Sequence, residues 1–148
     1  MIPPLVVGYG NTLRGDDAAG VIAAELVRER LPGVDVVVVH DIQPELAEAL
    51  TRRPLVIFLD AAEGTEELVC TTIDTSAPVP PVQSHLFSPS QILALCSSLY
   101  GSIPPKVYIV GIPAHDFSYA QEISALTAVA IEESVDVVGK LIEEHNRG

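Results

Sequence analysis

The segment Leu55-Val56-Ile57-Phe58-Leu59-Asp60 is an unbroken apolar run that ends in a carboxylate. A strand with one solvated face would alternate polar and apolar residues, and this run does not alternate. It is therefore typical of a strand buried on both faces, as in a parallel sheet covered by helices. Short apolar runs also occur at residues 5–7, 34–39 and 107–110, and they predict further strands of this sheet.

Helical patterns lie between these strands and after them. The first helix is expected to follow Asp17 and to end at Pro32-Gly33, and a short second helix is expected over residues 44–50. Ser88 begins a capping-box sequence and is therefore the expected N-cap of a third helix. The last helix is expected to begin between residues 118 and 124 and to run to about residue 144.

A further strand is expected over residues 68–73, only a few residues after the run that ends at Asp60. This connection is too short for a parallel crossover, so the strand should run antiparallel at or near an edge of the sheet. The sequence thus predicts a three-layer α/β fold with a mixed, mostly parallel five-stranded sheet and helices on both faces. No linker or internal repeat interrupts it, so residues 1–148 are expected to form a single domain.

The composition restricts the partners. The 148 residues include 8 Lys and Arg against 20 Asp and Glu, a net charge of −12, so nucleic acid and anionic membrane surfaces are poor partners. The N-terminal Met1-Ile2-Pro3-Pro4 lacks a basic flank and a long apolar run, so no signal peptide and a cytoplasmic location are expected. Cys70 and Cys96 have no metal-site spacing and are expected to be core thiols.

Ligands of open α/β sheets collect beyond the carboxyl ends of the parallel strands. The polar residues that the sequence places at this edge are Asn11, Arg14, Asp16, Asp17, His40, Asp41, Asp60, His115 and Asp116, with Ser84 and His85 in the loop before the third helix. Carboxylates and imidazoles dominate this set, which is the composition of a metal site.

Other chemistries fit less well. The turn Gly8-Tyr9-Gly10 lacks the third glycine of a dinucleotide fingerprint, and the acids that follow it would repel a pyrophosphate. Neither the Gly-x-Ser-x-Gly elbow of serine hydrolases nor the His-Glu-x-x-His motif of zinc proteases is present.

Three residues of this edge differ in how readily a structural role explains them. One of Asp16 and Asp17 is expected to cap the first helix, which leaves the other carboxylate available. Asp60 ends a wholly apolar strand, where an unpaired carboxylate is costly, so a functional role is favoured. His85 alone would be an ordinary loop histidine. A functional role for it is favoured only by its expected place beside these acids.

Several motifs, in order along nearly the whole chain, resemble the hydrogenase maturation proteases, which process the large subunit of [NiFe] hydrogenases. The most specific is the stretch 8–20, Gly-Tyr-Gly-Asn-Thr-Leu-Arg-Gly-Asp-Asp-Ala-Ala-Gly, which is similar to the family's Gly-x-Gly-Asn-x-Leu-x-x-Asp-(Asp/Glu)-x-x-Gly. Weaker matches are Gln43-Pro44-Glu45-Leu46, Leu59-Asp60-Ala61, Ser84-His85-Leu86-Phe87-Ser88-Pro89 and Leu99-Tyr100-Gly101.

The resemblance implies that Asp17, Asp60 and His85 are the metal-binding and catalytic residues. The family often has Glu at the first of these positions, so the shorter Asp17 is expected to shift that ligand by about one bond length. The resemblance also implies an endopeptidase that removes a short C-terminal extension from a [NiFe] hydrogenase large-subunit precursor after nickel insertion. The nickel is then the ion of the substrate and is not permanently bound to the protease.

Two mechanisms are possible for the hydrolysis of the peptide bond. A metal-positioned water is the working hypothesis, and a reaction that uses a carboxylate is the alternative. Asp16 either orients such a water or caps the helix. Two other functions remain to be tested: a non-catalytic protein that checks or carries nickel on the same fold, and a nucleotide-binding domain.

Overall fold

The computed structural model describes residues 2–75, 88–119 and 122–148. Its elements, in chain order, are β1 (Leu5–Tyr9), the 3-10 helix η1 (Gly15–Ala18), α1 (Ala19–Arg30), β2 (Asp35–Val39), α2 (Leu46–Leu50), β3 (Leu55–Ala62), β4 (Val69–Thr72), α3 (Pro89–Tyr100), β5 (Lys106–Pro113) and α4 (Ala125–Arg147). No helix within these residues is long and apolar enough to span a bilayer.

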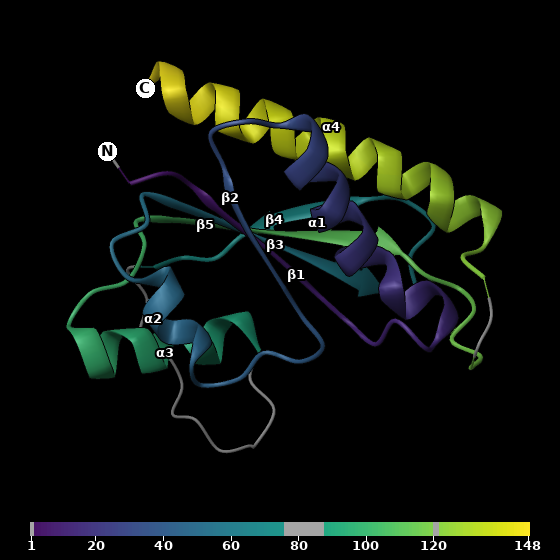
Figure 1. Cartoon of the computed structure of the whole chain (residues 1–148), viewed down its shortest axis with the longest axis horizontal. Coiled ribbons are helices and arrows are strands. Elements are labelled where there is room, and N and C mark those ends of the chain that lie inside the picture. Colours follow the sequence, from purple (N-terminus) through teal and green to yellow (C-terminus); the bar gives the residue numbers. More distant parts are fainter. Residues whose placement is uncertain (1, 76–87, 120–121) are drawn as a thin grey trace.

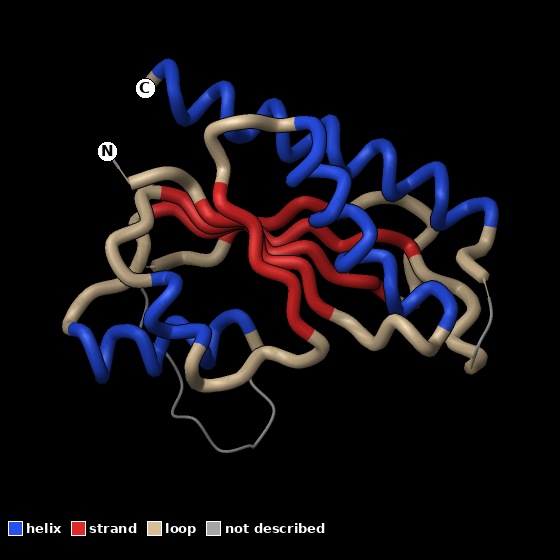
Figure 2. Tube along the Cα trace, viewed as in Figure 1, coloured by secondary structure: helices blue, strands red, loops and turns tan. Residues whose placement is uncertain are grey.

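The strands form one five-stranded sheet in the order β2-β1-β3-β5-β4. β1, β2, β3 and β5 are parallel, and β4 lies antiparallel to β5 at the edge. The helices α1 and α4 cover one face and α2 and α3 the other, so the fold has three layers (Figures 1 and 2). The predicted fold class and the antiparallel edge strand are confirmed.

The central strand β3 explains why its sequence does not alternate. Leu55, Ile57 and Leu59 pack in the core beneath α1 and α4, whereas Val56 and Phe58 pack in the core beneath α2 and α3. All five side chains are fully buried, because each face of the sheet faces a helix layer. The apolar run therefore supplies both cores from one strand.

Helix α3 begins as the sequence predicts. Ser88 Oγ accepts a hydrogen bond from Gln91 N at 3.2 Å, and Gln91 Oε1 accepts one from Ser88 N at 2.9 Å. We expect Ser88→Ala to lower the free energy of unfolding by about 1 kcal/mol, because Gln91 N loses its side-chain acceptor and the reciprocal bond to Ser88 N is weakened. Urea unfolding of Ser88→Ala and of the exposed mid-helix Ser97→Ala would measure this, and an equal effect of both would contradict the capping role.

Two local predictions are wrong. The N-cap of α1 is Ala18, without a side-chain hydrogen bond, because η1 precedes the helix and turns Asp16 and Asp17 away from its first N–H groups. Cys70 is exposed, because it lies on the edge strand β4, which carries no helix over its side chains. Cys96 is buried as predicted.

Candidate carboxylate site at the sheet edge

The loop after β1 is held against α1 by close backbone contacts. A Cβ on Gly20 would lie 2.3 Å from Leu59 O, and a Cβ on Gly10 would lie 2.1 Å from Asp17 O. Gly10 also has φ +149°, which side chains rarely tolerate. These contacts draw the start of α1 down onto β1 and β3. The glycines of the stretch 8–20 therefore bring the Asp17 region to the carboxyl end of β3.

Asp17 and Asp60 come together at this edge. Asp17 Oδ2 accepts a hydrogen bond from Asn11 N at 2.8 Å, and this bond fixes the side chain over the loop. Asp60 lies in β3 beside Gly111 of β5, and the two acids are near enough to repel each other. Asp17 and Asp60, two of the three predicted metal ligands, thus lie at the same edge of the sheet.

Asp60 is held by Tyr9. The Tyr9 hydroxyl donates to Asp60 Oδ2 at 3.0 Å, and its ring packs edge-on against Phe58, with centroids 6.4 Å apart. Burial and the nearby Asp60 charge raise the pKa of Tyr9, so its hydroxyl stays a donor. Sequence reasoning missed Tyr9, although its place in the glycine turn, one strand away from Asp60, was a usable signal.

The carboxyl group of Asp60 is harder to ionise than usual. Burial and the Asp17 charge raise its pKa to about 6, although the hydrogen bonds from Tyr9 and Ala61 favour the ionised form. A cation between the two carboxylates would relieve this repulsion. Because a half-buried pair of acids is costly without a counter-ion, the donor set of this edge fits a divalent metal.

His85, with Ser84, lies outside the described residues, so the third predicted ligand is not placed. Within the described residues, no group of three or more His, Cys, Asp and Glu side chains is arranged to hold a metal ion. The set formed by Asp17, Asp60 and His85 therefore stays a prediction.

Asp16 has a different role from the predicted ones. It is fully buried, and its carboxylate accepts hydrogen bonds from His115 N, Asp116 N and both the N and Oγ of Ser124, at 2.7–3.0 Å. Burial opposes its ionisation, but these bonds hold the pKa of Asp16 well below its usual range. With its oxygens taken by protein donors, Asp16 is not placed to orient a water, and the helix whose start it supports is α4.

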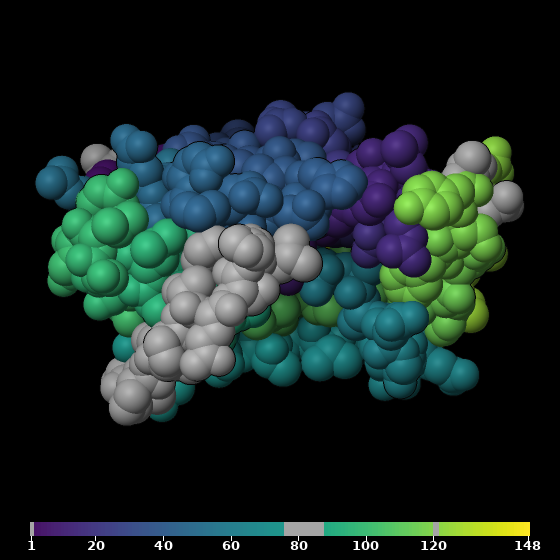
Figure 3. Space-filling view, turned by 90° about the horizontal axis from the view of Figure 1, so that it is seen from below, coloured from purple at the N-terminus to yellow at the C-terminus, as the bar shows by residue number. Residues whose placement is uncertain are grey.

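The remaining edge residues lie in separate groups. His40 Nε2 is 3.8 Å from Asp41 Oδ2, and both line a pocket of about 450 Å³ between β2 and α2. The Arg14 guanidinium lies 6.0 Å from the Phe117 ring and 5.8 Å from the Tyr119 ring. Figure 3 shows the loop after β1 beside the loop that precedes α4, so this edge forms one continuous surface.

Solved structures share this fold. The hydrogenase maturating endopeptidase HybD of E. coli matches with a TM-score of 0.77 and 20% identity over 97% of this chain and 93% of that chain. The chain has the hydrogenase maturation protease fold. The [NiFe] hydrogenase maturation protease HybD of Thermococcus kodakarensis matches at 0.73 and 20% identity, with coverage of 95% and 99%.

A third structure, the hydrogenase 2 maturation peptidase of a Thaumarchaeota archaeon, matches at 0.70 and 23% identity over 95% of this chain and 97% of that one. No protein-family model matches the chain, and no curated protein matches its sequence. The resemblance seen in the sequence is thus confirmed at the level of the fold.

Proposed function

We propose that the protein is an endopeptidase that removes a short C-terminal extension from the large-subunit precursor of a [NiFe] hydrogenase after nickel insertion. The observation that carries the proposal is the placement of Asp17 and Asp60 at the carboxyl edge of this fold, each oriented by a hydrogen bond from the β1 strand or the loop after it. Structures named as hydrogenase maturation proteases share the fold. Two of the motifs that resemble the family, residues 8–20 and 59–61, contribute Asp17 and Asp60 to this edge.

The nickel ion of the precursor is the recognised feature in this proposal. Asp17 Oδ2 accepts a hydrogen bond from Asn11 N, and Asp60 Oδ2 accepts one from the Tyr9 hydroxyl, while the Asp60 carboxylate also accepts from the Ala61 backbone. The remaining lone pairs of these carboxylates are available to a cation, and His85 is the third proposed ligand. Two carboxylates and an imidazole suit Ni²⁺ and leave coordination positions for ligands of the substrate itself.

The proposed hydrolysis uses a water that attacks the carbonyl carbon of the scissile peptide bond. A nickel-positioned water is the working hypothesis. A reaction in which a carboxylate of the site, Asp17 or Asp60, takes part directly is the alternative. The expected partner is the precursor protein in the cytoplasm.

Nucleotide binding is less well supported. In a phosphate-binding loop, N–H groups after the first strand point at the ligand. Here Asn11 N donates to the Asp17 carboxylate, so a negative charge of the protein itself occupies that position.

The test is the cleavage of a purified large-subunit precursor, prepared with and without nickel. We expect mass spectrometry to detect release of the C-terminal peptide only from the nickel-loaded precursor. Asp17→Ala, Asp60→Ala and His85→Ala should each abolish release, because each removes a proposed nickel contact. The exposed Asp136→Ala is a control that should process normally.

Two outcomes would change the proposal. Full processing by all three site variants would overturn the assignment of the site. Binding of the nickel-loaded precursor without release of any peptide would favour the non-catalytic protein that checks or carries nickel.

A further inference from the structure

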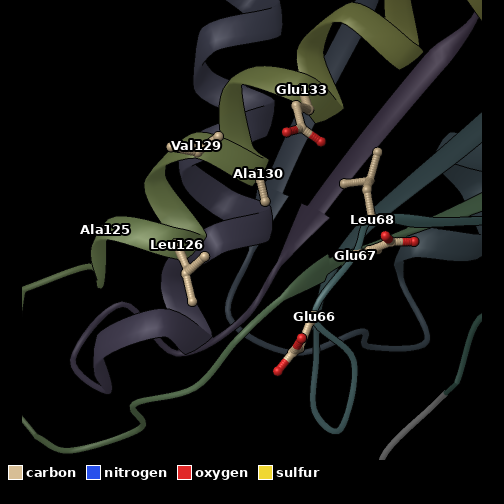
Figure 4. A pocket seen from close by; sticks show the side chains of 8 residues that line it. All are labelled: Glu66, Glu67, Leu68, Ala125, Leu126, Val129, Ala130 and Glu133. Atoms are coloured by element: carbon tan, nitrogen blue, oxygen red, sulfur yellow. The ribbon is translucent and has the colours of Figure 1, made fainter.

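A groove runs between α4 and the segment that enters β4. It has a volume of about 570 Å³, and its walls come from the first turns of α4 and from residues 66–68 (Figure 4). Leu126 and Val129 on α4 have 62% and 61% of their surface exposed, which is unusual for large apolar side chains so close together. Leu68 forms the opposite wall. Exposed apolar side chains gathered in a groove are typical of a protein-binding surface.

The rim of the groove is acidic. Glu66 and Glu67 lie on one side and Glu133 on the other (Figure 4), and the lining contains no Lys or Arg. None of the ion pairs in the described part of the chain includes these three glutamates. Apolar walls beneath unpaired carboxylates are complementary to a segment that carries apolar side chains next to lysine or arginine.

The groove and the carboxylate site lie at the same end of the sheet, on different faces. Asp60 shares the α2–α3 face with Phe58 and Tyr9, whereas Leu68 of the groove packs on the α1–α4 face. Asp60 of β3 and Val69 of β4 both pair with Gly111 of β5, so they occupy one row across the sheet. Two strand spacings put their Cα atoms about 10 Å apart. The groove wall at residues 66–68 directly precedes Val69. A folded protein that spans this end of the sheet can therefore contact Asp60 on one face and the groove on the other.

We propose that this groove docks the hydrogenase large-subunit precursor through a segment with apolar side chains flanked by Lys or Arg. The inference rests on the proposed function for the identity of the partner, but not for the chemistry of the surface. Docking at the groove adds binding energy away from the scissile bond, while Asp17 and Asp60 contact the nickel. It therefore affects the affinity for the precursor and not the chemical step.

The test measures binding of the nickel-free precursor, which the proposed function leaves uncleaved, by biolayer interferometry. We expect the double variant Leu126→Asp/Val129→Asp to raise Kd about tenfold or more, because it places charge on an apolar contact surface. Glu133→Lys should raise Kd about threefold or more, and added salt should weaken wild-type binding. Glu144→Lys, another exposed glutamate of α4, is the matched control and should bind as the wild type does.

Both apolar positions are exposed, so the variants should keep their fold, which circular dichroism would check. With the nickel-loaded precursor, the double variant should raise KM by a similar factor and leave kcat within about twofold.

Equal Kd values for wild type, groove variants and control would overturn the docking surface. If wild type binds the precursor through the groove but releases no peptide, the docking surface stands and the proposed proteolysis fails. If wild type does not bind the nickel-free precursor but cleaves the nickel-loaded one, the docking surface is overturned and the proposed proteolysis stands.

Discussion

Asp16→Ala is expected to lower the free energy of unfolding by about 3–5 kcal/mol. The side chain has no exposed surface, and its oxygens accept hydrogen bonds from His115, Asp116 and Ser124. Alanine would leave these donors without an acceptor in a buried place, and each such donor costs about 1–3 kcal/mol. Urea unfolding followed by circular dichroism measures the loss.

The effect extends to two distant parts of the chain. Ser124 is the N-cap of α4, and its Oγ both donates to Asp16 and accepts from Thr127 N at 3.4 Å. Hydrogen exchange should therefore be faster in Asp16→Ala at the loop after β5 and in the first turn of α4. Asp116→Ala is the control, since that carboxylate makes its bond to Ser118 N on the surface, and its effect on stability should be far smaller than that of Asp16→Ala.

The stability contributed by Asp16 is expected to decrease at low pH. The pKa of Asp16 is lower in the folded protein than its usual value of 3.8, so its bonds stabilise the fold above that pH. This contribution is lost as the pH falls below about 4 towards the folded pKa, and the difference between wild type and Asp16→Ala should shrink there. A difference that is constant from pH 3 to pH 8 would contradict the role of the ionised carboxylate.

The fold could be predicted because its signals are local and repeated. The run 55–59 is apolar at every position, since alternate residues serve opposite cores, and the short connection to β4 permits only an antiparallel strand. The capping box at Ser88 is likewise complete within four residues of sequence. The extra 3-10 turn η1 was not predictable in this way, because it depends on contacts with the loop after β5, such as Asp16 N to Asp116 O at 2.7 Å.

The site was predictable only in part, because some of its contacts join residues that are far apart in the sequence. Parallel strands bring their carboxyl ends to one edge, so the place of Asp60 and of the loop after β1 at that edge follows from the strand order. The approach of Asp17 depends in addition on the close backbone contacts at Gly10 and Gly20. The different roles of the adjacent acids Asp16 and Asp17 could not be predicted from the strand order, because they depend on the backbone of Asp116, about a hundred residues away. The bond between Tyr9 and Asp60 depends likewise on side-chain packing between two strands.

Asp60→Asn is expected to stabilise the protein at pH 8 while it removes the proposed activity. Burial and the charge of Asp17 raise the pKa of Asp60 from 3.8 to about 6, so the ionised carboxylate costs stability in the fold. The full rise corresponds to about 3 kcal/mol, which partial solvent access reduces to an expected gain of about 1–2 kcal/mol. Asparagine keeps an oxygen that can accept from the Tyr9 hydroxyl.

The contribution of Asp60 to stability changes with pH in the opposite direction to that of Asp16. Between about pH 4 and pH 6 the folded protein binds more protons than the unfolded chain, so wild-type stability falls relative to Asp60→Asn as the pH rises. Below about pH 4 the two proteins should be equally stable. Urea unfolding at pH 4 and pH 8 measures this, with the exposed Asp41→Asn as the control.

Processing of the nickel-loaded precursor by Asp60→Asn should fall by about a hundredfold or more, because the amide neither accepts a proton nor offers a charge to nickel. A variant that is more stable at pH 8 and inactive would show that the fold bears the cost of this carboxylate for its chemistry. A variant that is less stable at every pH would instead show that Asp60 is structural. In that case the raised pKa would carry no argument for function, and the site would rest on Asp17 and His85.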